Sequence, residues 1–241
     1  MTRNIDIVAC PALYQYQRKG GTVVLIDVLR FTSTLTTALA NGALWAEAYP
    51  DADKALSLKD EGYIAIGEHN GFIIEGFDYN NSPVTMTREN IGGRKLAFVT
   101  TNGTYTRSLI DTYDAIYAGC FLNGNALVQR LLEEHNDVQI VCSGHRCKIG
   151  IDDLLVAGMI ADRLLKSGKY THNEDAVSMA QTLYNVAKDD IKSFILSQVP
   201  WFEPLFVENP QYKEDFNFAL RHDVFDVVPE EESPLKFIVK Q

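Results

Sequence analysis

The stretch IDVLRFTSTLTTALANGA, residues 26–43, decides the fold predicted for this chain. It continues the apolar run TVVL of residues 22–25, which has the pattern of a buried strand. Asp27 and Arg30 then interrupt this pattern, and four of the six residues after Arg30 carry hydroxyl groups. A helical pattern follows as far as the Asn-Gly pair at 41–42, a common helix end. The stretch therefore predicts a strand, a polar turn and a helix in succession.

The same order of strand, turn and helix recurs in two further places. KLAFVT leads through TNGT into YTRSLIDTY over residues 95–113, and VQIVCSG leads through HRCKIGI into DDLLVAGMIADRLLKSG over residues 138–168. Three such units predict an α/β fold with helices packed on the faces of a sheet. No linker composition divides the chain, so we expect a single catalytic unit over residues 1–241. Two similar internal halves with an unknown boundary remain an alternative.

The carboxyl-terminal third has weaker patterns. Residues 174–197 predict an amphipathic helix with a bend near Asp189 and Asp190. Residues 199–210, VPWFEPLFVENP, are rich in proline and aromatic residues, and residues 212–229 predict a short helix followed by a strand.

Composition excludes several classes of protein. Of the 241 residues, 46% are hydrophobic and 22% are charged, which are values typical of globular chains. The net charge of -10 counts against a nucleic-acid binder, because such proteins need a basic face. An anionic substrate must therefore be bound by local groups or by a bound cation. We expect no membrane span, a cytoplasmic location and four reduced cysteines, since no long apolar window and no paired CxxC motif occur.

The turn after the first strand has the residue types of an anion site. Thr32, Ser33 or Thr34 can cap a helix whose amino terminus favours negative charge. Arg30 supplies a planar cation suited to phosphate or sulfonate, and Asp27 can bind a divalent cation or orient a water. The alternative is a purely structural helix cap with Arg30 on the surface.

The loop GEHNGFIIEGFDYNNSP, residues 67–83, is rich in carboxylates. Magnesium prefers oxygen ligands, usually one or two carboxylates together with water and substrate phosphate. Glu68 and Asp78 are the better candidate metal ligands in this loop, because a glycine next to Glu68 and another two residues before Asp78 let the backbone turn. A solvated acidic loop with no metal remains the alternative.

Two later turns offer further candidates. In VTTNGT, Asn102, Gly103 and Thr104 can donate amide and hydroxyl hydrogens to an anion, although Asn-Gly is also an ordinary turn signal. In CSGHRCKIGIDD, residues 142–153, we assign Ser143 and Gly144 to substrate binding. The spacing from Cys142 to Arg146 is too short for the phosphate loop of cysteine-dependent phosphatases.

The same turn also contains candidate catalytic groups. His145 can act as a general acid, since the usual histidine pKa lies near working pH. One of Asp152 and Asp153 can serve as a base or metal ligand. Each has a structural alternative, because loop histidines are commonly solvated and carboxylates are favoured in the first turn of a helix in any case.

Together these segments resemble the 2-phosphosulfolactate phosphatase family. Its members carry DVLRATTT-, GE…GFD.GNSP-, TTTNGT- and CAG…ED-like segments in this order, and the similarity runs from about residue 23 to residue 165. The matching positions are Asp27, Arg30, Thr32, Thr34, Glu68, Asp78, Asn80, Ser82, Thr101, Asn102, Gly103, Thr104, Gly144 and Asp153. In the place of the family's alanine stands Phe31, which we expect to narrow the pocket, and the GHRCKIG loop adds positive charge.

The resemblance implies a layered α/β/α fold with a central mixed sheet and allows a homo-oligomer. It also implies a magnesium-dependent phosphatase that converts 2-phospho-3-sulfolactate into sulfolactate and phosphate, a step towards coenzyme M. We expect Asp27, Glu68 and Asp78, with Asp153 as a fourth ligand, to bind magnesium. The metal and Arg30 would neutralise the phosphate while a water attacks phosphorus. The alternatives are a phosphatase of another small anionic ester and a non-catalytic protein that binds a phosphorylated metabolite.

Overall fold

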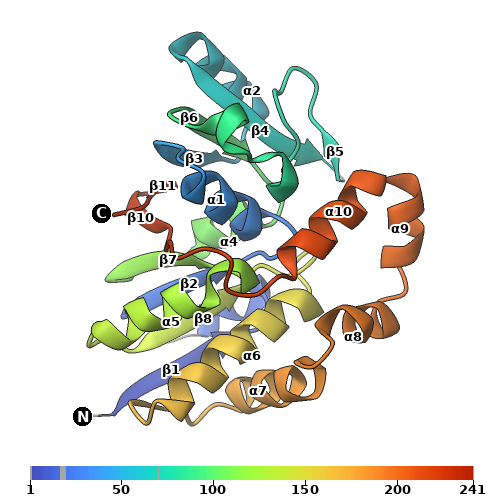
Figure 1. Cartoon of the computed structure of the whole chain (residues 1–241). Helices are drawn as coiled ribbons and strands as arrows, with labels where there is room; N and C mark the ends of the chain where they lie inside the picture. Colours follow the sequence, from blue (N-terminus) through green and yellow to red (C-terminus); the bar gives the residue numbers. More distant parts are fainter. Residues whose placement is uncertain (1, 17–19, 70, 241) are drawn as a thin grey trace.

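The structure is a computed structural model that describes residues 2–16, 20–69 and 71–240. One mixed sheet of 11 strands forms its centre in these residues, in the order β5-β4-β6-β3-β11-β10-β7-β2-β8-β1-β9 (Figure 1). The strands are β1 Arg3–Val8, β2 Thr22–Ile26, β3 Trp45–Tyr49, β4 Tyr63–His69, β5 Phe72–Ile73, β6 Lys95–Val99, β7 Ala115–Gly119, β8 Val138–Cys142, β9 Tyr170–Thr171, β10 Glu230–Ser233 and β11 Lys236–Ile238. The predicted α/β fold with a mixed sheet is confirmed.

Two parallel segments make up most of the sheet. One contains β7, β2, β8, β1 and β9, and the other contains β3, β6 and β4. The carboxyl-terminal hairpin β10–β11 lies between them, with β10 antiparallel to β7 and β11 antiparallel to β3. A hairpin from the end of the chain therefore joins the two segments. Whether these segments are similar halves stays a prediction.

Helices cover both faces of the sheet, as the layered fold requires. They are α1 Phe31–Ala40, α2 Ala52–Ser57, α3 Arg88–Ile91, α4 Gly103–Leu109, α5 Gly124–Glu133, α6 Ile151–Lys166, α7 Asp175–Ala187, α8 Ile191–Gln198, α9 Phe202–Glu208 and α10 Pro210–Ala219. None of the helices in the described ranges is long and apolar enough to cross a membrane.

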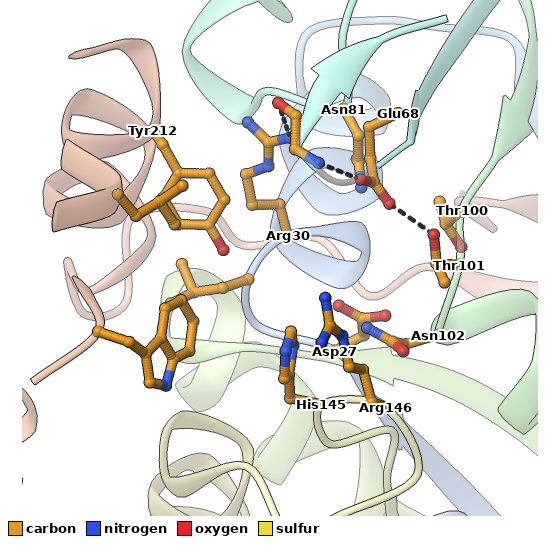
Figure 2. A pocket seen from close by; sticks show the side chains of 14 residues that line it. Asp27, Arg30, Glu68, Asn81, Thr100, Thr101, Asn102, His145, Arg146 and Tyr212 are labelled. Atoms are coloured by element: carbon orange, nitrogen blue, oxygen red, sulfur yellow. Dashed lines mark hydrogen bonds between the residues drawn. The ribbon is translucent and has the colours of Figure 1, made fainter. Parts of the chain in front are cut away.

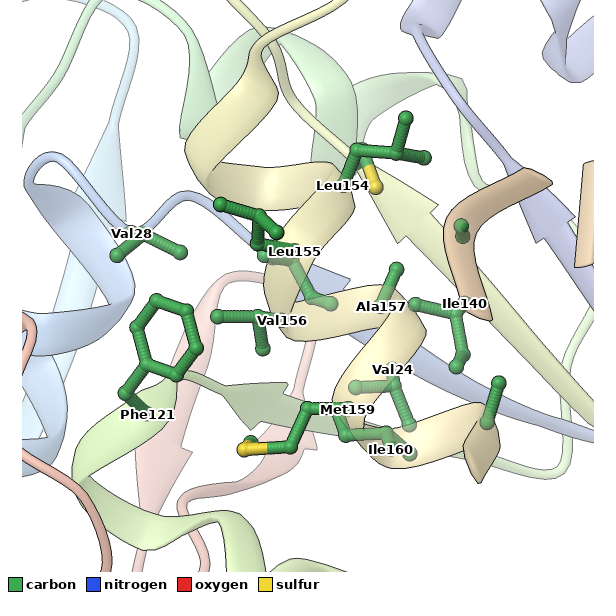
Figure 3. Packing of buried hydrophobic residues seen from close by; sticks show 14 of the residues in the cluster. Val24, Val28, Phe121, Ile140, Leu154, Leu155, Val156, Ala157, Met159 and Ile160 are labelled. Atoms are coloured by element: carbon green, nitrogen blue, oxygen red, sulfur yellow. The ribbon is translucent and has the colours of Figure 1, made fainter. Parts of the chain in front are cut away.

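Strand β2 shows why helices pack on both faces of the sheet. All five residues of β2 are buried, and successive side chains of a strand point to opposite faces. Val24 and Ile26 pack in the cluster that contains α6, whereas Val23 and Leu25 pack with Leu35 of α1. Figure 3 shows the α6 side, where the apolar face of that helix lies against the sheet. The continuous apolar run is thus explained by burial on both faces.

The structure corrects the predictions made for the carboxyl-terminal third of the chain. The bend expected near residues 189–190 is a full break between α7 and α8, where the Asp190 carboxylate accepts a hydrogen bond from the Ser193 amide at 3.0 Å. The proline-rich stretch contains α9, and the predicted short helix is α10. The strand predicted before residue 229 is wrong, because ladder pairing begins only at Glu230.

Candidate active site

A cavity of about 250 Å³ lies where the carboxyl ends of β2, β4, β6 and β8 meet the α9–α10 region (Figure 2). Ligands of parallel α/β sheets commonly bind beyond the carboxyl ends of the strands. The walls of the cavity are formed by Asp27, Leu29, Arg30, Glu68, Gly71, Asn81, Thr100, Thr101, Asn102, His145, Arg146, Trp201, Leu205 and Tyr212. Thus all the strand-to-helix turns singled out in the sequence contribute to one cavity.

Asp27 is the carboxylate at the base of this cavity, and it is 5% exposed. One carboxylate oxygen accepts a hydrogen bond from the Phe31 amide at 3.2 Å. Burial raises the pKa of Asp27 to about 7, and the neighbouring negative charges of Asp152 and Glu68 act in the same direction. The site therefore destabilises the charge on Asp27 unless a cation is close by.

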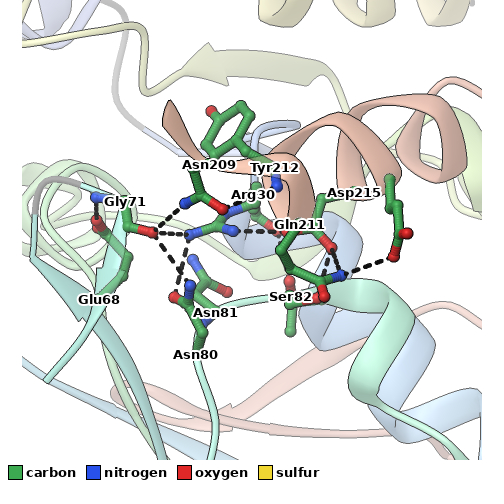
Figure 4. A network of polar contacts seen from close by, with 12 residues as sticks. Arg30, Glu68, Gly71, Asn80, Asn81, Ser82, Asn209, Gln211, Tyr212 and Asp215 are labelled. Atoms are coloured by element: carbon green, nitrogen blue, oxygen red, sulfur yellow. Dashed lines mark hydrogen bonds and ion pairs between the residues drawn. The ribbon is translucent and has the colours of Figure 1, made fainter. Parts of the chain in front are cut away.

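Arg30 also lines the cavity, but its positive charge is already balanced. Nη1 forms an ion pair with the buried Asp215 of α10 at 2.6 Å, and Nη2 donates to Asn80 at 3.1 Å (Figure 4). The guanidinium also lies over the ring of Tyr212, 4.7 Å from its centre. Ser82 donates to the other oxygen of Asp215 at 2.5 Å. Arg30 is consequently fixed in the wall by groups from two distant parts of the chain.

The three hydroxyl residues predicted to bind substrate lie outside the cavity lining. Thr32 donates to the carbonyl of Asp27 at 2.9 Å, Ser33 to that of Val28 at 2.8 Å, and Thr34 to that of Arg30 at 2.9 Å. All three side chains are fully buried. They stabilise the turn that carries Asp27 and Arg30, which is the structural alternative considered for this motif.

The expected narrowing of the pocket by Phe31 is wrong. Phe31 is 1% exposed and packs edge-on against Phe98 and Phe237, on the core side of the turn. The Cβ of any residue larger than glycine at position 103 would lie 2.5 Å from the Phe31 ring and 3.0 Å from Asp27. Phe31 and Gly103 thus fit together beneath the carboxylate.

The two carboxylates of the acidic loop are separated by the structure. Glu68 lines the cavity, where it accepts hydrogen bonds from the Gly71 amide at 2.7 Å and the Thr101 hydroxyl at 3.1 Å. Asp78 is not among the lining residues. Its oxygens bind Lys59 at 2.8 Å and the Ala65 amide at 2.8 Å, so its role is to fasten the loop to β4.

In the turn after β6, Asn102 faces the cavity together with Thr100 and Thr101. Thr104 does not, because its hydroxyl donates to the carbonyl of Thr100 at 2.5 Å inside the first turn of α4. The predicted Asn-Gly-Thr site is therefore reduced to the asparagine and its neighbours.

Asp153 links the turn after β2 to the turn after β8. It is 3% exposed, and its two oxygens accept hydrogen bonds from the Val28 amide at 2.8 Å and the Gly144 amide at 2.7 Å. Burial, together with the nearby charges of Asp152 and Asp27, raises the pKa of Asp153 well above its usual value. Asp153 therefore has a positioning role whether or not it contacts a ligand.

Ser143 and His145, which lie in the turn after β8, differ in exposure. Ser143 is buried, and its hydroxyl has no hydrogen-bond partner among the described residues. His145 lies on the cavity wall with its ring stacked on Trp201 at 5.3 Å. Partial burial and the adjacent Arg146 charge lower the pKa of His145, which favours its neutral form. A neutral ring favours proton acceptance over the general-acid role expected from sequence.

Three aspartates lie together beside the cavity, and carboxylate oxygens are the donors that a hard divalent cation prefers. A small extension of the cavity is lined by Asp27, Asp152 and Asp153, and burial raises the pKa of Asp152 to about 6. Nearby cations stabilise ionised carboxylates, and magnesium needs only one or two protein carboxylates. The described residues contain no cluster of three or more His, Cys, Asp or Glu side chains arranged as metal ligands. Asp27, Asp152 and Asp153 thus line one small space, whereas Asp78 is bound to Lys59 and the Ala65 amide outside it.

The carboxyl-terminal helices contribute side chains to the cavity that the sequence patterns do not predict. Trp201, Leu205 and Tyr212 line the cavity, and Asp215 balances Arg30. The signal available was the cluster of aromatic residues in the stretch VPWFEPLFVENPQY, residues 199–212. Aromatic residues in such a stretch usually pack in a core, so the pattern alone could not assign them to a site.

Comparison with known proteins gives a consistent result over nearly the whole chain. Residues 9–234 match the family model described as 2-phosphosulpholactate phosphatase. A protein of Clostridium acetobutylicum is 34% identical over 93% of this chain and 95% of its own length, and one of Thermotoga maritima is 33% identical over 93% and 94%. A protein of Caldanaerobacter subterraneus subsp. tengcongensis is 33% identical over 88% of each chain. All three are named probable 2-phosphosulfolactate phosphatase. The chain therefore belongs to the 2-phosphosulfolactate phosphatase family, which makes it a phosphoric monoester hydrolase.

Proposed function

We propose that this enzyme hydrolyses the phosphate monoester of 2-phospho-3-sulfolactate to sulfolactate and phosphate, and that it requires magnesium. The observation that carries the proposal is the group of aspartates 27, 152 and 153 beside the cavity, in a member of this family. Burial disfavours the charged forms of Asp27 and Asp152, and a bound cation would offset this cost, while a phosphate ester would supply the remaining oxygen ligands.

Asp27 would hold the metal, with Asp152 or Asp153 as its partner. When bound, magnesium supplies positive charge for the phosphate oxygens, which become more negative in the transition state. The Asn102 side chain lies on the same wall and donates a hydrogen bond to a phosphate oxygen. Arg30 shapes the opposite wall, because its charge is balanced by Asp215.

A water attacks phosphorus, and the bond from phosphorus to the ester oxygen breaks. Neutral His145 has one ring nitrogen with a lone pair, so it accepts a proton from the attacking water. The sulfolactate oxygen leaves with the bonding electron pair and takes a proton from solvent. This role for His145 replaces the general-acid role considered from the sequence.

We further propose that the enzyme works in the cytoplasm, in a route that leads to coenzyme M. The four cysteines support the first part, because all are free thiols and the exposed Cys147 would be prone to oxidation elsewhere. The second part rests on the resemblance of the sequence motifs and follows only if phosphosulfolactate is the preferred substrate.

Phosphate release tests this function. We expect turnover of phosphosulfolactate that needs magnesium, stops with a chelator and exceeds turnover of other phosphorylated hydroxy acids. Preference for another ester would retain the chemistry and replace the substrate. Saturable binding without phosphate release from any ester would instead indicate a non-catalytic binding protein.

A further inference from the structure

The charges around the cavity leave one cation without a partner. Among the described lining residues, the permanent cations are Arg30 and Arg146. Arg30 is paired with Asp215, whereas Arg146 forms no ion pair and no side-chain hydrogen bond with a described residue. The cavity lining also contains the carboxylates Asp27 and Glu68, and neither is hydrogen-bonded to Arg146. Arg146 is thus the free positive group of this wall.

The backbone around Arg146 is held in an unusual turn. His145 and Lys148 exchange two backbone hydrogen bonds of 3.0 Å, which makes a two-residue hairpin. Its central residues Arg146 and Cys147 have φ angles of 52° and 60°, a left-handed conformation that glycine and asparagine prefer. Residues of other types adopt this conformation only at an energetic cost. The tight turn therefore places an arginine where backbone preference alone would favour glycine.

Tight packing at Gly144 and the ring contact of His145 fix the base of this hairpin beside the cavity. Gly144 has a φ of 61°, and a Cβ there would lie 1.9 Å from the carbonyl oxygen of Lys148. The His145 ring stacks on Trp201. Figure 2 shows the Arg146 side chain reaching into the cavity from the side opposite Arg30. The guanidinium is accordingly presented to a ligand and not to solvent alone.

We propose that Arg146 binds a second oxyanion of the substrate, the one that does not react, and so determines specificity. The inference rests on the proposed function, in which the substrate carries a carboxylate and a sulfonate besides its phosphate. Both groups match the planar guanidinium, which can donate two parallel hydrogen bonds. The nearby walls formed by Leu29, Trp201 and Leu205 offer mainly apolar surface for the rest of the molecule.

The test compares Arg146→Gln with Lys148→Gln, which removes the same charge from the same exposed loop outside the cavity lining. Three phosphate esters are used: phosphosulfolactate, 2-phospholactate without the sulfonate, and isopropyl phosphate without either second oxyanion. We expect Arg146→Gln to raise KM for phosphosulfolactate on the order of 10- to 100-fold, with kcat nearly unchanged. Isopropyl phosphate should be hydrolysed within about twofold of the wild-type rate, since there is no second oxyanion to lose. Arg146→Lys should recover part of the loss, and Lys148→Gln should resemble wild type.

The ester panel also identifies the group that Arg146 binds. A similar rise in KM for 2-phospholactate assigns the carboxylate, and no rise assigns the sulfonate; both outcomes support the proposal. Equal losses on all three esters, or no loss on any, would overturn it.

The proposed function is judged separately, from the ester that the wild type prefers. Were the wild type to release no phosphate at all, calorimetric titration with sulfolactate would still decide. Affinity at least about tenfold weaker in Arg146→Gln supports the proposal, and equal affinity contradicts it.

Discussion

At the scale of single residues, the partner of each polar side chain decides whether that side chain faces the cavity. Asp27, Arg30, Glu68, Asn102 and His145 do line one cavity. The hydroxyls of residues 32–34 instead bind backbone carbonyls, and Asp78 binds Lys59. A motif gives residue types and spacing, whereas the choice between a backbone partner and a ligand depends on burial that only the folded chain defines.

The pair Arg30–Asp215 gives a prediction at this scale. Both side chains are at most 2% exposed, so Asp215→Asn leaves an uncompensated buried cation and should lower the free energy of unfolding by about 3–5 kcal/mol. Urea denaturation measures the change. The double variant Arg30→Met, Asp215→Leu removes both charges and should cost less than the single change. If the double variant is the less stable of the two, the pair is not acting as a buried ion pair.

At the scale of elements, hydrophobic period and helix-stop residues predicted the helices that follow β2, β6 and β8. The same reasoning did not predict that α9 and α10 would cover the cavity, because no local pattern encodes packing over such a distance in sequence. Asp215 lies 185 residues from Arg30. Long-range pairs of this kind are set by the order of strands in the sheet.

The packing of α6 against α7 gives a pH-dependent prediction. Asp162 of α6 has a side chain that is 7% exposed, and it accepts hydrogen bonds from Lys166 at 2.6 Å and from Gln181 of α7 at 3.1 Å. Burial alone would raise the pKa of Asp162, but these hydrogen bonds outweigh it and lower the pKa below its usual value. The carboxylate therefore contributes stability above the unfolded pKa of about 3.9, and this contribution is lost as pH falls through the folded pKa.

Asp162→Asn should accordingly lower the free energy of unfolding at pH 7 by about 1 kcal/mol, a modest value because Lys166 is largely exposed. The difference from wild type should shrink as pH falls below about 4. Urea denaturation at pH 7 and at lower pH measures both, with the exposed Asp189→Asn as control. A difference that stays constant with pH would show that the carboxylate charge does not matter.

At the scale of the whole molecule, three strand-to-helix units were enough to predict the fold class, but not the role of the chain end. The hairpin β10–β11 is short and charged, so its sequence gives little sign that it joins two parallel segments. Strand order depends on pairings between distant residues, which local patterns do not specify.

Phe237 of β11 tests this joining role. It is 1% exposed and lies against Phe31, directly below the turn that carries Asp27. Phe237→Ala should cost about 3–5 kcal/mol of stability, as other buried phenylalanine truncations do. Val239→Ala, at a partly buried position two residues later, should cost less. Thermal unfolding measures the stability lost in each variant. Equal small losses would mean that the hairpin contributes little to joining the two segments of the sheet.

The role of Asp27 in catalysis is tested most directly by comparing magnesium-dependent phosphate release by two variants, Asp27→Asn and Asp78→Asn. Both changes remove one carboxylate from a family motif, but only Asp27 lines the cavity. We predict that Asp27→Asn lowers kcat/KM for phosphosulfolactate by about 100-fold or more, comparable to removing one electrostatic group from an active site. Asp78→Asn should retain activity within about tenfold and respond to magnesium as the wild type does. Full activity and an unchanged magnesium response in Asp27→Asn would contradict the account.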